Sequence, residues 1–135
     1  MPGGCTALLE AVRRVAGERL PRRRGSYIVV FGSVAEGRCG PLSDVDIAVK
    51  GLSLEEAAKL AEAVEAATGR RVDVVILEHA GLPLRYEALG RGVLVAGDRE
   101  AFTLDRWLAI VEWLDFRDAY EHMHNAYLKR ILRRP

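Results

Sequence analysis

Two short apolar runs joined by a twelve-residue loop constrain the fold of this chain most strongly. Residues 26–31 and 44–50 are rich in β-branched and aromatic side chains, a composition that predicts two strands. The first run has no polar interruption, which indicates a strand buried on both faces. Short connections usually join neighbouring strands, so we expect the two to pair. An antiparallel pairing would bring both ends of the loop to one edge of a sheet.

The residues at the two ends of that loop are suited to holding a nucleotide. Gly32 and Ser33 open the loop, and after ten further residues come Asp44 and Asp46. Side chains two apart in a strand point to the same side, so the two carboxylates project together and repel each other. A divalent cation removes that repulsion, and oxygen ligands suit Mg²⁺. Gly32 allows a phosphate close to the backbone, Ser33 adds a hydroxyl, and a helix starting at Ser33 would aim N–H groups at the anion.

A third acid is expected on the next strand, residues 71–77. Asp73 is the acid inside this apolar run, where a charge is costly unless a partner neutralises it. Three carboxylates around two Mg²⁺ ions suit nucleotidyl transfer, with one ion activating a hydroxyl and the other holding the triphosphate. Asp73 would also assist as general base toward the acceptor hydroxyl. The alternative is structural: Asp73 pairs with Arg70 or Arg71, and the aspartate pair only caps a loop.

The order of predicted elements implies an α+β fold with a small mixed sheet, flanking helices and a long C-terminal helix. Ser53 and Glu56 form a capping box that starts one helix, and Gly69 ends it. Strands should neighbour one another in chain order. We expect one domain over residues 1–135, with these elements: helix 6–20, strands 26–31 and 44–50, helix 53–69, strand 71–77, a short helix 83–89, a brief strand 93–96, and a helix from about 98 to 134 that is continuous or broken once.

Composition excludes several classes of protein. The chain has 135 residues and a formal net charge of +1, so bulk charge predicts neither a nucleic-acid nor a membrane partner. No apolar run approaches the ~20 residues of a membrane span, and the first residues lack a signal pattern, so the cytoplasm is expected. Cys5 and Cys39 are predicted to be isolated thiols. Asn125 is the sole asparagine and glutamine is absent. A heat-loving source and a GC-rich genome both remain open.

The C-terminal helix has more apolar residues than one buried stripe needs. Leu104, Leu108 and Val111 are predicted to face the sheet. A second line would be a contact surface for a partner or a second copy if exposed, or part of the core if buried; both interpretations stay open. Its residues are Trp113, Phe116, Tyr120, Met123, Tyr127 and Ile131. RNA or an acidic partner could contact Arg22–Arg24, Arg130, Arg133 and Arg134, but a solvated face is favoured.

At the loop, the chain resembles the minimal nucleotidyltransferase (MNT) domain of the polymerase-β-like superfamily. The signature of that family is Gly-Ser, ten residues, then Asp-x-Asp, and Gly32, Ser33, Asp44 and Asp46 match it. The loop is similar at Ala35, Gly37, Pro41 and Ser43, the segment 84–95 resembles the stretch after the family's third acid, and the likeness covers about residues 26–100. One departure is Glu36, where many members carry a basic residue, so Arg38 would have to replace that charge.

The resemblance implies a nucleotidyltransferase fold and a reaction. Short relatives act as antitoxins that transfer AMP from ATP, with Mg²⁺, to a tyrosine of a HEPN-domain RNase toxin. On this basis Gly32 and Ser33 bind the β- and γ-phosphates, while Asp44, Asp46 and Asp73 form the catalytic and metal-binding set. Two alternatives stay open. One is a nucleotidyltransferase for a small molecule or an RNA end with a separate acceptor-binding subunit. The other is a non-catalytic antitoxin that neutralises by binding.

Overall fold

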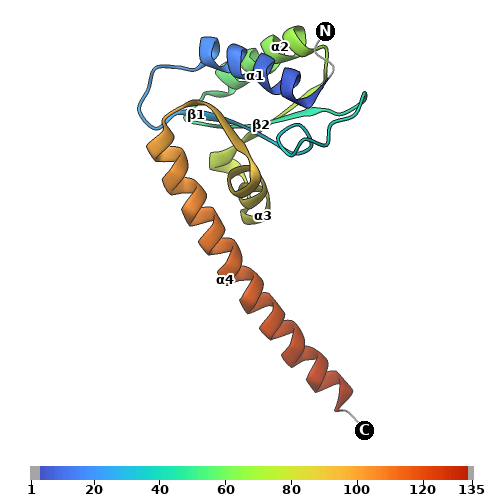
Figure 1. The fold of residues 1–135 in the computed structure, drawn as a ribbon. Coiled ribbons are helices and arrows are strands. Elements are labelled where there is room, and N and C mark those ends of the chain that lie inside the picture. The colour runs from blue at the N-terminus through green and yellow to red at the C-terminus, as the bar shows by residue number, and fades with distance from the viewer. Residues whose placement is uncertain (1–3, 134–135) are drawn as a thin grey trace.

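A four-stranded sheet carries helices on both faces, and one long helix leaves it to project away from the rest of the molecule (Figure 1). The computed structural model describes residues 4–133. Its elements agree with the predicted α+β fold: α1 (Cys5–Arg19), β1 (Tyr27–Phe31), β2 (Val45–Lys50), α2 (Leu54–Thr68), β3 (Val72–Ile76), a 3₁₀ turn η1 (Leu77–His79), α3 (Leu82–Arg85), a π-helical turn η2 (Tyr86–Gly90), β4 (Val93–Gly97) and α4 (Arg99–Leu132).

The strands lie in the order β3-β2-β1-β4. β1 and β2 pair, as predicted, and their sense is antiparallel, with Phe31 opposite Asp46. β2 and β3 are parallel, with Asp46 beside Asp73. The prediction that strands consecutive in the chain are neighbours in the sheet is wrong for β4, which pairs with β1 instead of β3. The reason is that α3 and η2 lie across one face of the sheet and return the chain to the free edge of β1.

β1 is the centre of the core, and all five of its residues are buried. Ile28 and Val30 pack on the side of α1 and α2, whereas Tyr27, Val29 and Phe31 pack with residues of η2 and α4 on the other side. This confirms the expectation of a strand buried on both faces. The same alternation in β2 turns its odd-numbered residues toward α1 and α2, and its even-numbered residues toward η2.

The predicted capping box at the start of α2 is present. The Ser53 hydroxyl accepts from the Glu56 backbone N–H at 3.1 Å, and the Glu56 carboxylate accepts from the Ser53 N–H at 2.8 Å. That second hydrogen bond, together with Arg23, holds the pKa of Glu56 below its usual range. Arg23 also donates to the carbonyl of Gly51 at 2.9 Å, so part of the predicted basic surface has a structural role. Arg134, its last member, lies outside the described residues.

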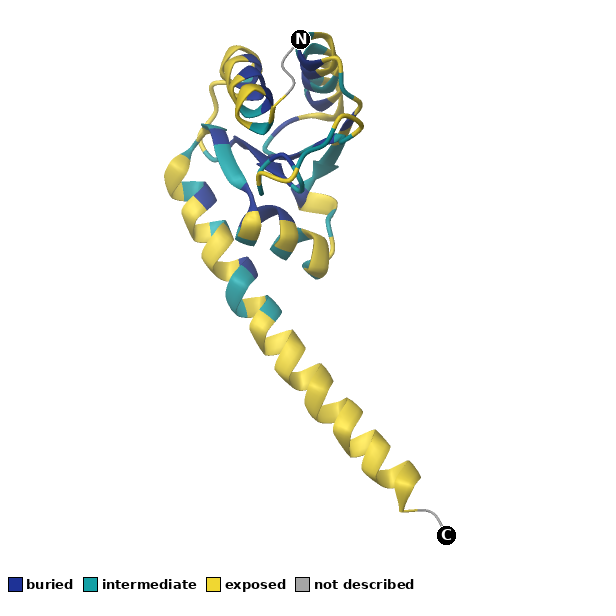
Figure 2. Cartoon of the chain, turned by 45° about the vertical axis from the view of Figure 1, so that its right-hand side comes forward, coloured by how far each residue is buried: buried dark blue, intermediate teal, exposed yellow. Residues whose placement is uncertain are grey.

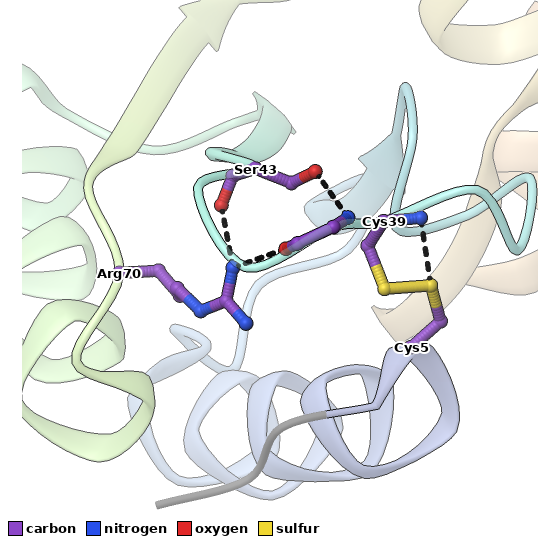
Figure 3. Close-up of a disulfide and its surroundings, with 5 residues drawn as sticks. Cys5, Cys39, Ser43 and Arg70 are labelled. Carbon is purple, nitrogen blue, oxygen red and sulfur yellow. Dashed lines mark hydrogen bonds between the residues drawn. A yellow bond between two sulfur atoms is a disulfide. The ribbon is translucent and has the colours of Figure 1, made fainter.

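The two cysteines are joined, and the prediction of isolated thiols is wrong. A disulfide links Cys5 to Cys39 with their Cα atoms 5.7 Å apart (Figure 3). It ties the first turn of α1 to the loop that leads to β2. Arg70 holds the same loop from the other side by donating to the carbonyls of Gly40 at 2.8 Å and Ser43 at 3.1 Å. The loop between the glycine–serine pair and the aspartates is therefore fixed at two points.

α4 is a continuous helix, and its contact face differs from the predicted one. Phe102 and Ala109 are its buried residues, while Leu104 and Leu108 are 58% and 41% exposed and Val111 is half-buried. The helix crosses η2 and β1 obliquely. The residues of α4 that pack against these elements therefore lie along a different line of the helix from the predicted apolar residues.

Beyond residue 113 every described side chain of α4 is exposed (Figure 2). From Phe116 onward the second apolar line is therefore not folded into the core of this chain, and its interpretation as part of the core is wrong there; Trp113, the first residue of the line, is half-buried and packs on Tyr86 of η2. The predicted helix end at residue 134 lies outside the described residues. Among the described helices, none combines the length and apolar character that a bilayer crossing requires.

Candidate functional site

The predicted carboxylates meet at the end of the sheet where β1 finishes. Asp46 lies opposite Phe31, the last residue of β1, and beside Asp73 on β3. Neighbouring strands are about 4.8 Å apart, and residues in register share a face, so both carboxylates start from the η2 face. Asp44 comes one residue before β2 and two before Asp46. The structure thus brings all three predicted acids to one edge.

Gly32 brings the backbone directly against this group. Its φ is +74°, a left-handed conformation, and a Cβ atom at this position would lie 2.3 Å from Oδ2 of Asp46. A larger residue would therefore be strained and would also displace that carboxylate. The sequence predicts that Gly32 lets a phosphate come close to the backbone. The structure shows that the absence of a side chain at Gly32 leaves space for the carboxylate of Asp46.

The loop after Gly32 is a series of turns, and the predicted helix starting at Ser33 does not form. The Glu36 N–H donates to the carbonyl of Gly32 at 3.1 Å, and the Arg38 N–H donates to the carbonyl of Ser33 at 2.9 Å. Gly37 takes a positive φ of +72°, which prevents a regular helix from continuing. Backbone N–H groups of a turn can bind an anion as those of a helix start do.

Negative charge accumulates at this edge. Burial raises the pKa of Asp46 above its usual value, and the nearby carboxylates of Asp73, Asp44 and Glu87 raise it further. Asp73 has an ion pair with Arg71 at 3.8 Å, but both side chains are at least half exposed, and such a surface pair contributes little. Asp73 is therefore free to take part in another interaction.

The chemistry of this set fits a hard divalent cation. Within residues 4–133, no three carboxylate, imidazole or thiol side chains are already arranged around a common point that would hold a metal ion. The three aspartates nevertheless offer oxygen ligands. Burial first, and then repulsion from the neighbouring carboxylates, raises the pKa of Asp46, and a bound cation would relieve the repulsion. The carboxylates would have to draw together when an ion binds.

Two residues near the site were not predicted from the sequence. Arg91, just after η2, forms an ion pair with Glu36 across the loop, and Arg38 donates to the same carboxylate at 2.7 Å. The hydrogen bond from Arg38, with the charge of Arg91, holds the pKa of Glu36 below its usual range. Glu87 on η2 is the second unpredicted residue. Both Arg91 and Glu87 lie in the segment 84–95 already noted for its resemblance, but no local pattern links them to the loop.

A cavity of about 510 Å³ lies at the opposite end of the sheet and is separate from this edge. Tyr27, Lys50 and Asp105 line it; the Tyr27 hydroxyl donates to Asp105 at 2.8 Å, and Lys50 forms an ion pair with the same carboxylate. Burial, then Asp105, raises the pKa of Tyr27. The polar groups of this cavity are thus paired with one another.

Residues 24–101 match a family model described as polymerase beta, nucleotidyltransferase. No curated protein is similar enough to the chain to count as a match.

Solved structures share the fold. One is a toxin–antitoxin crystal structure with AMP-PNP (21% identity, 89% of this chain and 98% of that chain covered, TM-score 0.67). Another is a tri-AMPylated HEPN toxin of Shewanella oneidensis in complex with an MNT antitoxin (19%, 92% and 98%, TM-score 0.63). A third is the toxin–antitoxin MntA–HepT (19%, 91% and 98%, TM-score 0.62).

Proposed function

Because the chain belongs to the polymerase beta nucleotidyltransferase family, we propose that it transfers AMP from ATP to a tyrosine hydroxyl of a HEPN-type toxin and so acts as an antitoxin. The observation that supports this most is that Asp44, Asp46 and Asp73 lie at one edge of the sheet, beside the Gly32–Ser33 turn and within the residues that match the family. We expect the reaction to take place in the cytoplasm, where ATP is available.

Each residue of the edge has a role in this proposal. Asp44 and Asp46 would hold Mg²⁺, and Asp73 would complete the set. Bound Mg²⁺ would neutralise phosphate charge and lower the pKa of the acceptor hydroxyl. Asp73, which is half exposed, accepts the proton of the incoming hydroxyl as general base. Ser33 and the turn N–H groups bind the β- and γ-phosphates.

The chemical step follows from these positions. The acceptor oxygen forms a bond to the α-phosphorus of ATP, and the bond from that phosphorus to the bridging oxygen of pyrophosphate breaks. The hydroxyl proton passes to Asp73, and pyrophosphate leaves with the electron pair of the broken bond. The products are an AMP ester of the acceptor and pyrophosphate.

Arg38 and Arg91 supply the positive charge that a basic residue at position 36 would give. Glu36 contributes one negative charge and the two arginines two positive charges, which leaves a net +1 at the loop. Arg91 is 59% exposed at its side chain, so it can turn one N–H toward a γ-phosphate without leaving Glu36. Glu36 is then a positioning residue for Arg91.

The partner class comes from the structural neighbours. The protein crystallised with AMP-PNP belongs to a toxin–antitoxin pair, and the MNT antitoxin of Shewanella oneidensis was solved with an AMPylated HEPN toxin. These proteins share the fold of this chain over about nine-tenths of its length.

The test is incubation of the purified chain with α-³²P-ATP, Mg²⁺ and the product of the neighbouring gene, which the proposal expects to be a HEPN-type toxin. We expect label on that protein, at a tyrosine identified by mass spectrometry, and loss of its RNase activity. Label that appears on RNA or a small molecule instead would support the first alternative.

The variant Asp44→Asn/Asp46→Asn separates catalysis from binding. We expect it to transfer no AMP and to leave the toxin active. If the variant neutralises the toxin as well as the wild type does, neutralisation is by binding alone and the enzymatic proposal is wrong.

A further inference from the structure

The outer half of α4 exposes a line of large apolar side chains. Phe116, Tyr120, Met123 and Tyr127 are between 50% and 71% exposed, and their spacing of three and four residues places them on one side of the helix. This half of α4 is exposed throughout (Figure 2). Contiguous exposed apolar surface of this kind usually marks a contact with another molecule.

The line continues the contact that α4 already makes with the body. Trp113 stacks on Tyr86 of η2 with ring centroids 5.2 Å apart. Phe116 follows at 6.0 Å from Trp113, and Tyr120 at 6.3 Å from Phe116. The aromatic rings are therefore ordered along the helix before any partner binds, which lowers the entropy cost of association.

The spacing of the line is that of a coiled-coil seam. Trp113, Phe116, Tyr120, Met123 and Tyr127 are separated by three, four, three and four residues, and Arg130 follows three later. This alternation is the a/d pattern by which two helices pack side by side. We call these six residues the α4 seam.

Trp113, Tyr120 and Tyr127, seven residues apart, take the a positions of this pattern. The residues that precede the a positions favour one orientation of the partner. They are Glu112, Ala119, Ala126 and Arg133, seven residues apart, with an acid at one end, a base at the other and small side chains between. In an antiparallel pair of identical helices Glu112 of one copy meets Arg133 of the other, and Ala119 meets Ala126. In a parallel pair Glu112 would meet Glu112, and Arg133 would meet Arg133.

The seam itself is also self-complementary when antiparallel. In the same antiparallel pair Phe116 lies opposite Tyr127 of the other copy and Tyr120 opposite Met123, since both pairs are symmetric about position 121.5, one residue from the midpoint of 122.5 for the flanking pairs. Trp113 then meets Arg130, a cation–π pair. No ion pair to Arg133 is present within the described part of the chain, whereas Glu112 is 3.2 Å from Arg85 at an exposed edge and can accept a second donor.

We propose that the α4 seam is a homodimer interface, at which α4 of one copy lies antiparallel to α4 of a second copy. The seam covers residues 113–130, about 27 Å of helix at about 1.5 Å per residue, which is short for a coiled coil. We therefore expect a dimer with a dissociation constant on the order of micromolar. The two bodies lie at opposite ends of the pair, and the edge with Asp46 stays outside it.

The test is sedimentation equilibrium of the full-length protein from about 1 to 100 µM. The wild type should dimerise, and Arg133→Glu should weaken dimerisation at least ten-fold. Glu112→Arg/Arg133→Glu, which exchanges the two charges, should return the affinity to within about three-fold of the wild type.

Two further variants control the experiment. Lys129→Glu makes the same change of charge on an exposed position outside the seam and its flanks, and it should change the affinity less than two-fold. Tyr120→Ala/Met123→Ala should abolish the dimer while circular dichroism shows unchanged folding, since both side chains are exposed.

Several results would overturn the proposal. A wild type that is monomeric at 100 µM alone and binds only a HEPN-type protein through this helix would assign the seam to that partner. Equal effects of Arg133→Glu and Lys129→Glu, or no recovery in the exchanged variant, would exclude the antiparallel pairing. None of these measurements depends on AMP transfer.

Discussion

Substitution of Gly32 by alanine tests whether the turn and Asp46 form one unit. Gly32 has a φ of +74°, and a Cβ atom there would lie 2.3 Å from Oδ2 of Asp46. The variant therefore has two separate penalties: a left-handed backbone for an L side chain and a clash with a carboxylate. Gly37→Ala is a matched control, because Gly37 has a φ of +72° but no heavy atom within 4 Å of the place that a Cβ atom would occupy.

The backbone penalty should be the same in both variants, roughly 1–2 kcal/mol. Unfolding entropy of about 2.1 cal/mol/K per residue amounts to about 0.28 kcal/mol/K for 135 residues, so the melting temperature should fall by about 4–7 °C in each case. The clash adds a different effect. The carboxylate is the mobile end of its side chain, so it should rotate away at small cost in stability and lose its position at the site.

The assay combines thermal unfolding with Mg²⁺-dependent binding of a fluorescent ATP analogue. We expect similar losses of melting temperature, but a loss of nucleotide affinity of ten-fold or more in Gly32→Ala alone. Equal nucleotide affinity in the two variants would refute the reasoning that Gly32 makes room for Asp46. An unchanged melting temperature in both would refute the backbone argument.

Three further predictions concern charge and covalent structure. Burial and neighbouring carboxylates raise the pKa of Asp46, so its ionisation opposes folding. Without Mg²⁺ the stability of the wild type should therefore fall as the pH rises through that raised pKa. Asp46→Asn should lack this pH dependence, melt at a higher temperature than the wild type at neutral pH and bind Mg-ATP poorly. Arg91→Ala should weaken ATP binding roughly ten-fold, equivalent to about 1.4 kcal/mol, and leave adenosine binding unchanged. The reason is that Arg91, held by its ion pair with Glu36, is proposed to contact the phosphates, which adenosine lacks. Equal losses of affinity for both ligands in a titration would contradict this. Cys5→Ser should lower the free energy of unfolding in urea by up to about 4 kcal/mol, as expected for the 34-residue separation from Cys39. A reducing agent should lower the free energy of unfolding of the wild type to the same value and leave that of the variant unchanged.

The parts of the site that sequence predicts are those set by neighbouring residues. Gly32 directly follows β1 and Asp46 lies in β2, two strands joined by one loop, so antiparallel pairing of these strands brings the two residues together. Chain order predicts Asp73 on the strand next to that of Asp46, whereas the parallel register that places the two residues side by side comes from the structure. The capping box at Ser53 likewise depends on residues three apart.

The parts that sequence missed depend on contacts between distant segments. Arg91 meets Glu36 only because α3 and η2 cross the sheet and return the chain beside β1, an arrangement that no short pattern encodes. The buried face of α4 was mispredicted for a similar reason. Which residues of the helix are buried depends on how it crosses η2, and this crossing buries Phe102 and Ala109.

The disulfide was missed because two isolated cysteines, 34 residues apart, carry no spacing signal in the sequence. Only the folded chain brings the first turn of α1 beside the loop that leads to β2.

The central claim is that three aspartates beside the Gly32–Ser33 turn hold the metal ion of a nucleotide. A crystal structure with Mn²⁺ and a non-hydrolysable ATP analogue tests it directly through the anomalous scattering of manganese. We predict a manganese peak between the carboxylates of Asp44 and Asp46, with Asp73 within reach and the β- and γ-phosphates against Ser33. A nucleotide bound elsewhere, or no manganese at these oxygens when the nucleotide is present, would contradict the claim.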